Sequence, residues 1–303
     1  MNHLLKMNDL TREELYHILD VAVELKAAQK AGGTPPLLAG KSVALMFSKA
    51  STRTRTSFEV GVFQLGGLGS YMNAATELQA SRGEPLRDTA RVLGRYYDCI
   101  VWRTYRQRDL EELAEYAGVP VINGLTDYAH PCQVLADLMT IRERRGALEG
   151  QKLCFVGDGN NMANSLIVGG LLAGMQVTCV CPPAYRPAAD VLMFAHRYGQ
   201  AFRLLHDPRE GVRDADVVLT AVWNNAAGEE AERRMRDFQG YQLTSALLAG
   251  AKPGCMVLHC LPAHRGEEIS SAVFEDHADE IFTEAENRLH VQKAVLAILL
   301  AGK

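Results

Sequence analysis

Short apolar runs alternate with longer amphipathic stretches along the whole chain, and this alternation restricts the fold more than any other feature. Runs of three to five apolar residues suit strands that are buried on both faces of a parallel sheet, and the stretches between them have helical periodicity. Strands are predicted over residues 43–47, 69–72, 100–103, 119–123, 153–156, 177–181, 203–205, 217–220 and 256–259. The pattern therefore predicts an α/β fold of mostly parallel sheets with helices on both faces.

The predicted strands fall into two sets, which indicates two lobes. A length of 303 residues is itself typical of two domains. Glycines at 146 and 150 lead out of a predicted helix over residues 132–144 and into a new strand. We expect a first domain over residues 1–133 and a second over 134–285. We expect a C-terminal segment, 286–303, whose helix over residues 287–300 returns to the first domain.

Charge and composition exclude several classes of protein. The net charge of −4 argues against general binding to nucleic acid or to anionic membranes. No apolar run is long enough to cross a bilayer, and the N-terminus lacks the apolar core of a signal peptide. The seven cysteines form no CxxC pair. These features predict a cytoplasmic protein with no metal site, no nucleic-acid partner and no membrane association.

Residues 51–56, with the sequence Ser-Thr-Arg-Thr-Arg-Thr, lie between the first predicted strand and a helix expected from residue 57. A helix N-terminus offers unpaired N–H groups and a partial positive charge, and arginines strengthen such a site for phosphate. The segment is equally typical of an ordinary Ser/Thr helix cap followed by solvated arginines. Taken alone, it supports both interpretations.

Other polar residues follow other predicted strands, at the sheet edge where α/β proteins bind ligands. Arg103, His130 and Cys260 all lie there, although each has a structural explanation: a surface charge, a turn histidine and a buried thiol. The Gly-Asp-Gly at 157–159 resembles the start of a dinucleotide loop. Met162 occupies the position of the third glycine, which argues against a nicotinamide cofactor.

Several motifs together resemble the aspartate/ornithine carbamoyltransferase family. They are Ser-Thr-Arg-Thr-Arg at 51–55, His-Pro-Cys-Gln at 130–133 and His-Cys-Leu-Pro at 259–262. Segments 88–93, 157–161 and 286–288 point to its ornithine branch, as does Cys260, where aspartate enzymes carry proline. The resemblance covers nearly the whole chain, with the motifs in the family's order.

The resemblance implies transfer of a carbamoyl group from carbamoyl phosphate to an amine, without a cofactor, by a homotrimer or a multiple of trimers. Ornithine, giving citrulline for arginine biosynthesis, is the first expected acceptor. The implied catalytic residues are Arg53, Arg103, His130 and Cys260. The implied carbamoyl-phosphate-binding residues are Ser51, Thr52, Arg53, Thr54, Gln79, Arg103, His130, Gln133, Cys260, Leu261 and Arg288. Gln79 matches a position that reaches into the site of a neighbouring subunit.

The acceptor loop, residues 221–228, departs from the family pattern. The implied acceptor-binding residues are Asn161, Ala221, Asn224, Asn225 and Ala226. Ornithine enzymes carry Asp-x-Trp-x-Ser-Met-Gly here, and the aspartate binds the α-ammonium of ornithine. In this chain Ala221 replaces that aspartate, Asn225 the serine and Ala226 the methionine, and one residue is inserted before Glu229.

Loss of a charge-assisted hydrogen bond costs about 1.5–3 kcal/mol, so the acceptor stays open at this point. Two alternatives follow. In the first, the chain is an ornithine enzyme with a rearranged loop, and Glu229 or Glu230 supplies the missing carboxylate. In the second, it carbamoylates a different amine or amide. A third possibility is a non-catalytic protein that binds carbamoyl phosphate. The retention of Arg103, His130 and Cys260 counts against it, because a simple phosphate sensor does not need all three.

Overall fold

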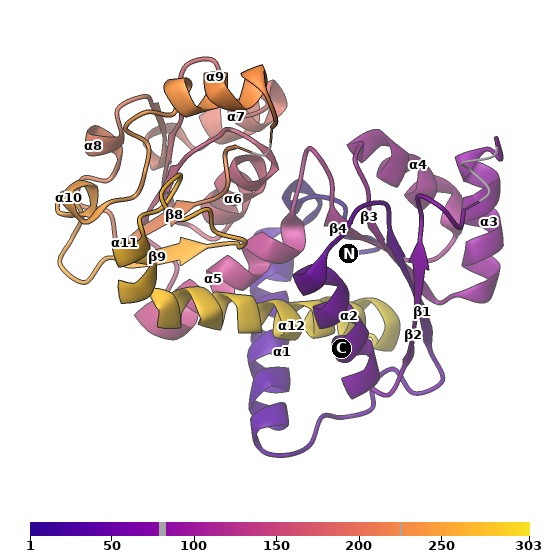
Figure 1. Cartoon of the computed structure of the whole chain (residues 1–303). Helices are drawn as coiled ribbons and strands as arrows, with labels where there is room; N and C mark the ends of the chain where they lie inside the picture. Colours follow the sequence, from indigo (N-terminus) through magenta and orange to yellow (C-terminus); the bar gives the residue numbers. More distant parts are fainter. Residues whose placement is uncertain (79–82, 225) are drawn as a thin grey trace. The chain divides into compact units, whose positions relative to one another are not determined.

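The computed structural model describes residues 1–78, 83–224 and 226–303 (Figure 1). By its contacts the chain divides into two compact units, Met1–Met139 with Glu286–Lys303, and Thr140–Ala285. One division falls inside helix α5 (Pro131–Arg145) and the other inside helix α12 (Ala278–Ala301). The domain limits expected from the sequence, 1–133, 134–285 and 286–303, remain predictions.

The first unit is built on a four-stranded parallel sheet in the order β2-β1-β3-β4. Its strands are β1 (Ser42–Phe47), β2 (Leu68–Asn73), β3 (Cys99–Arg103) and β4 (Val121–Leu125), and its other elements are η1 (Met7–Asp9), α1 (Arg12–Lys30), α2 (Thr52–Gln64), α3 (Leu86–Tyr96) and α4 (Gln107–Ala117). Side chains alternate between the two faces of a strand. Ala44 and Met46 therefore pack in a cluster with side chains of α3 and α4. Leu45 points to the other face, where it and Val62 of α2 both lie next to Gly69.

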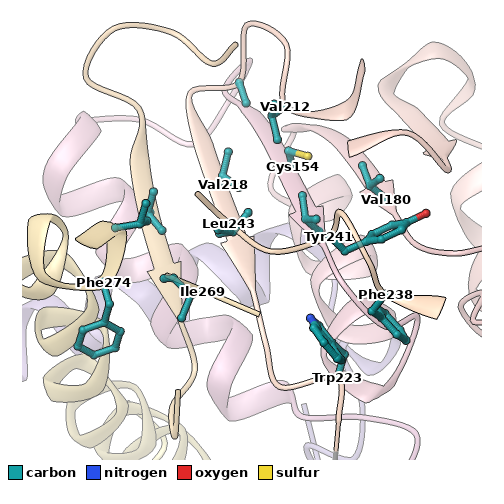
Figure 2. Packing of buried hydrophobic residues seen from close by; sticks show 14 of the residues in the cluster. Cys154, Val180, Val212, Val218, Trp223, Phe238, Tyr241, Leu243, Ile269 and Phe274 are labelled. Atoms are coloured by element: carbon teal, nitrogen blue, oxygen red, sulfur yellow. The ribbon is translucent and has the colours of Figure 1, made fainter. Parts of the chain in front are cut away.

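The second unit is built on a five-stranded parallel sheet in the order β7-β6-β5-β8-β9. Its elements are β5 (Lys152–Val156), α6 (Asn161–Leu172), β6 (Gln176–Val180), α7 (Ala189–His196), η3 (Gly199–Ala201), β7 (Phe202–Leu205), α8 (Pro208–Gly211), β8 (Val217–Thr220), α9 (Glu229–Asp237), α10 (Ser245–Leu248), β9 (Met256–His259) and α11 (Ser271–Asp276). Leu153 and Val177 face Gly170 of α6. Cys154 and Val218 face the opposite way, into the apolar cluster of Figure 2.

The predicted fold class is confirmed, because both sheets are parallel and carry helices on their faces. All nine predicted strands are present, and the largest displacement is at β4, which lies two residues later than expected. Two helix starts were predicted too late. Helix α2 begins at Thr52, inside the Ser-Thr-Arg motif, since Ser51 already has the extended conformation of a residue just before a helix. Helix α12 begins at Ala278, well before residue 287.

The C-terminal half of α12 packs within the first unit, as predicted. Lys26 of α1 donates from Nζ to Asn287 Oδ1 at 2.7 Å. Lys293 donates from Nζ to Gln29 Oε1 at 2.6 Å and to Gln64 Oε1 at 3.0 Å, so it joins α12 to α1 and to α2. Lys293 is fully buried, and burial lowers the pKa of its ammonium group to about 8. Among the described residues, no helix has the combined length and apolar character that crossing a membrane requires.

Lys293→Met should remove the part of the pH dependence of the unfolding free energy that comes from the titration of Lys293. The pKa of Lys293 is about 8 in the folded chain, below its ordinary 10.5, so between these values the unfolded chain binds more protons. Stability should therefore rise with pH over this interval in the wild type, by at most about 3 kcal/mol. Urea unfolding at several pH values measures this rise. The exposed Lys30→Met is the control and should keep the wild-type slope; a Lys293→Met slope equal to wild type would contradict the prediction.

Candidate active site

The N-terminus of α2 lies directly after β1, and its capping residue leaves the helix end open. Ser51 makes no side-chain hydrogen bond to the first turn, although its backbone is extended. The interpretation of Ser51 as a simple side-chain cap therefore has no support in the structure. A hollow of about 430 Å³ adjoins this turn. It is lined by Phe47, Lys49, Ala50, Ser51, Thr52, Arg55, Thr56, Glu59 and Tyr71.

Arg288 of α12 joins three helices of the first unit through buried hydrogen bonds. Its Nη2 donates to Thr54 Oγ1 at 2.8 Å, and its Nη1 donates to Gln133 Oε1. Gln133 in turn donates from Nε2 to Asp137 Oδ1 at 2.8 Å. Thr54 belongs to α2 and Gln133 to α5, so three of the predicted carbamoyl-phosphate residues meet here although they are far apart in the sequence.

His130 is buried, and positive charges surround it. Burial lowers the pKa of its imidazole well below the ordinary 6.5, and the charges of Arg288, Arg103, Lys49 and Arg53 lower that pKa further, in this order. Four cations therefore act on one imidazole. A histidine in this environment is neutral at pH 7 and keeps a single N–H to donate.

The two arginines of the Ser-Thr-Arg-Thr-Arg motif have different surroundings. The charge of Arg53 acts on His130. The guanidinium of Arg55 instead lies 3.6 Å from the centroid of the Tyr71 ring and pairs with Glu59 at 3.4 Å. Arg55 is thus engaged with its neighbours on α2 and β2, which leaves Arg53 as the arginine of this motif that belongs to the charged cluster.

Lys49 is a residue that the sequence analysis missed. It lies two residues after β1, lines the same hollow as Ser51 and Thr52, and contributes to the charge around His130. Burial lowers the pKa of the Lys49 ammonium first and Arg103 lowers it further, while Asp127 opposes them. A lysine between the predicted strand and Ser51 was the available signal, but surface lysines in such turns are common.

Cys260 and Leu261 follow β9 in the second unit, where His259 orders the backbone. The N–H of Leu261 donates to His259 Nδ1 at 2.8 Å, and His259 Nε2 lies 2.9 Å from Glu268 Oε1. Both His259 and Glu268 are buried. The structure thus explains the histidine of the His-Cys-Leu-Pro motif as a support for the turn. The roles of Cys260 and Leu261 toward carbamoyl phosphate remain predictions.

The predicted acceptor residues lie at the ends of two neighbouring strands, β5 and β8. Asn161 opens α6, which Asn160 caps by accepting from the N–H of Met162 at 3.0 Å. Ala221 follows β8 and is buried. Asn224 Oδ1 is also buried and accepts no hydrogen bond from the described residues. Ala226 is partly exposed; Gln79 and Asn225 lie outside the described residues.

The two glutamates considered as replacements for the missing aspartate lie in the first turn of α9. Glu230 is already paired with Arg233 at 2.6 Å and with Arg234 at 3.2 Å. Glu229 is exposed. The carboxylate nearest in sequence to Asn161 is Asp158, and it too is paired, with Arg234 at 2.8 Å.

Two domain models match the chain: the carbamoyl-P binding domain of aspartate/ornithine carbamoyltransferase over residues 2–143, and the Asp/Orn binding domain over 149–299. Ornithine carbamoyltransferase of Carboxydothermus hydrogenoformans is 53% identical, covering 98% of this chain and 96% of that protein. The anabolic ornithine carbamoyltransferase of Pyrococcus furiosus is 49% identical over 99% of this chain and 96% of that protein. The solved Pyrococcus furiosus structure matches with a TM-score of 0.95 at 48% identity, covering 100% of this chain and 98% of that one. The chain therefore belongs to the aspartate/ornithine carbamoyltransferase family.

Proposed function

We propose that this protein transfers the carbamoyl group of carbamoyl phosphate to ornithine, which gives citrulline and releases phosphate. The observation that carries the proposal is the cluster of four cations around the neutral His130, beside the N-terminus of α2. Such a concentration of positive charge suits a dianionic phosphate group. Relatives at 53% and 51% identity that are named ornithine carbamoyltransferase support ornithine over another acceptor and over a non-catalytic protein.

In this proposal the first turn of α2 binds the phosphate group. Ser51 and Thr52 offer hydroxyls, Thr54 offers the backbone N–H of its first-turn position, and Arg53 and Arg103 offer guanidinium groups. Because Thr54 Oγ1 accepts from Arg288, its own O–H is left to donate to the ligand. His130, Gln133 and Arg288 hold the carbamoyl end.

The proposed reaction needs groups that stabilise an oxyanion. The neutral δ-amine of ornithine attacks the carbamoyl carbon, a C–N bond forms, and negative charge develops on the carbamoyl oxygen. Arg103, the N–H of His130 and the hydroxyl of Thr54 would stabilise that oxygen. The C–O bond to phosphate then breaks, phosphate leaves with the bonding electrons, and the nitrogen loses a proton. Alignment of the two bound substrates supplies much of the remaining acceleration.

The expected roles of the other residues belong to the same proposal. Cys260 and the carbonyl of Leu261 would complete the carbamoyl pocket, and Gln79 would come from a neighbouring subunit. Asn161 and Asn224 would contact the amino acid. We also propose a cytoplasmic enzyme of arginine biosynthesis, which the word "anabolic" in the name of the Pyrococcus furiosus relative supports.

One assay tests the reaction. The purified protein is mixed with carbamoyl phosphate and ornithine, and citrulline and phosphate are both measured. Putrescine, lysine, aspartate and N-acetylornithine are tested in parallel. We expect ornithine to give equal amounts of the two products. Turnover with another amine but not with ornithine would identify that amine as the acceptor. Binding of carbamoyl phosphate without release of phosphate, whichever amine is present, would show a non-catalytic protein.

We further propose a homotrimer, supported by apolar side chains at the β2 edge of the first sheet. Phe63 of α2 is 78% exposed and Leu68 of β2 is 64% exposed. Burying such side chains against another subunit is favourable. Light scattering should give about 100 kDa, three times the 33.3 kDa chain. The double variant Phe63→Glu, Leu68→Glu should dissociate, whereas Tyr96→Glu, at an exposed position on α3, should not. A monomeric wild type would refute the trimer.

A further inference from the structure

Arg234 of α9 contacts the segments that follow three consecutive strands of the second sheet. Its Nη1 donates to the carbonyl oxygen of Trp223, after β8, at 2.6 Å and to Asp158 Oδ2, after β5, at 2.8 Å. Its guanidinium lies 4.9 Å from the centroid of the Tyr185 ring, after β6. Since β6, β5 and β8 are neighbours in the sheet, one side chain joins their carboxyl ends. This is the edge that carries the acceptor-binding residues of the proposed function.

The acceptor loop is held at Trp223 from two directions. The indole ring stacks on Phe238 with centroids 4.8 Å apart and planes 5° from parallel (Figure 2). The carbonyl oxygen accepts from Arg234. The N–H of Phe238 in turn donates to the carbonyl of Arg234 at 2.9 Å, so both contacts come from the same turn of α9. The position of Asn224, next in the chain, therefore depends on this turn.

Arg234 also neutralises the single carboxylate among residues 157–161 and 221–224. Asp158 is largely buried, with 16% of its side chain exposed. Burial raises the pKa of its carboxyl group, and the hydrogen bond and charge of Arg234 act in the opposite direction. Without the guanidinium, the carboxylate would be left buried and uncompensated beside the residues that open α6.

We infer that Arg234 is a positioning residue for the acceptor, and this inference rests on the proposed function. It holds the loop after β8 against the turn after β5, so it controls the affinity for ornithine but not the affinity for carbamoyl phosphate. Ala221 gives the loop no charged group of its own with which to bind the acceptor. The loop therefore depends on the fixed backbone that the planar, multiply donating guanidinium provides.

Arg234→Met, compared with Arg233→Met, tests the inference. Arg233 is the neighbouring arginine and pairs with Glu230, so its replacement removes an equal charge from the same helix. Three quantities are measured: the KM for ornithine, the Kd for carbamoyl phosphate without an acceptor, and the hydrogen exchange of peptides that cover residues 221–228. We expect Arg234→Met to raise the KM about tenfold and to speed exchange in the loop, with the Kd unchanged. Arg233→Met should change none of them, and Arg234→Lys should recover part of the loop protection.

Two results would overturn the inference. One is a wild-type KM together with wild-type loop exchange in Arg234→Met. The other is faster exchange throughout the second unit, because Arg234 would then stabilise the domain in general. The exchange and Kd measurements need no turnover. A wild type that does not carbamoylate ornithine would therefore count against the proposed function, while the exchange data would still decide the role of Arg234.

Discussion

Arg53→Ala should lower kcat/KM for carbamoyl transfer by about a thousandfold. Arg53 lies in the first turn of α2, and its charge is one of the four that act on His130. Phosphate gains negative charge as it leaves, so a cation at this position stabilises the transition state more than the ground state. Steady-state rates of citrulline formation, with ornithine saturating and carbamoyl phosphate varied, measure the loss.

Arg55→Ala is the matched control, because it removes an arginine two residues away on the same helix turn. Arg55 stacks on Tyr71 and pairs with the exposed Glu59, so its loss should cost less than about tenfold. A second measurement distinguishes charge from folding. The pKa of the His130 imidazole, followed by NMR, should rise in Arg53→Ala and stay unchanged in Arg55→Ala. Full activity in Arg53→Ala would show that the phosphate site has been placed wrongly.

Ala221→Asp should lower the KM for ornithine by about ten- to a hundredfold. The side chain at 221 is buried after the end of β8. The resemblance to the ornithine branch implies an aspartate here that binds the α-ammonium. A carboxylate at this position would form a charge-assisted hydrogen bond with the bound amino acid. Without ornithine, the same buried carboxylate should destabilise the protein. The KM for ornithine and the midpoint of thermal unfolding, with and without ornithine, measure the two effects.

Ala221→Asn separates charge from shape in this experiment. Asparagine matches aspartate in size but carries no charge, so it should lower the KM little while perturbing the packing equally. If Asp and Asn had the same effect, the carboxylate would not be the missing group. If Ala221→Asp weakened ornithine binding, the acceptor would approach the loop of this chain in a different orientation.

The strands inside the two sheets could be predicted from the sequence because a strand buried on both faces is a largely apolar run, as residues 43–47 illustrate. The edge strands β2 and β7 are partly exposed and carry a weaker apolar signal. The start of α2 could not, since Ser, Thr and Arg at 51–56 suit a turn as well as the first turn of a helix. Family motifs predicted Arg288, but its bond to Gln133 joins residues 155 positions apart, which local patterns do not reveal.

The role of Arg234 in the second unit could not be predicted from local sequence patterns either. It lies in the run Glu-Glu-Ala-Glu-Arg-Arg-Met-Arg-Asp at 229–237, which is charged along most of its length and suggests a solvated helix. Its partner Asp158 is 76 residues away. Only the fold brings the two charges together, so the sequence identified the altered acceptor loop but not the side chain that holds it.

The first unit is assembled from both ends of the chain, Met1–Met139 and Glu286–Lys303, and this has a consequence for biosynthesis. The ribosome makes the chain from the N-terminus, and domains tend to fold as their residues emerge. The second unit, Thr140–Ala285, is continuous and can be completed first. The N-terminal segment must wait for α12, which brings Arg288 to Thr54 and Lys293 to α1 and α2. A nascent chain that stops before residue 286 thus lacks the last segment of the first unit, and with it the hydrogen bonds that Arg288 makes to Thr54 and Gln133.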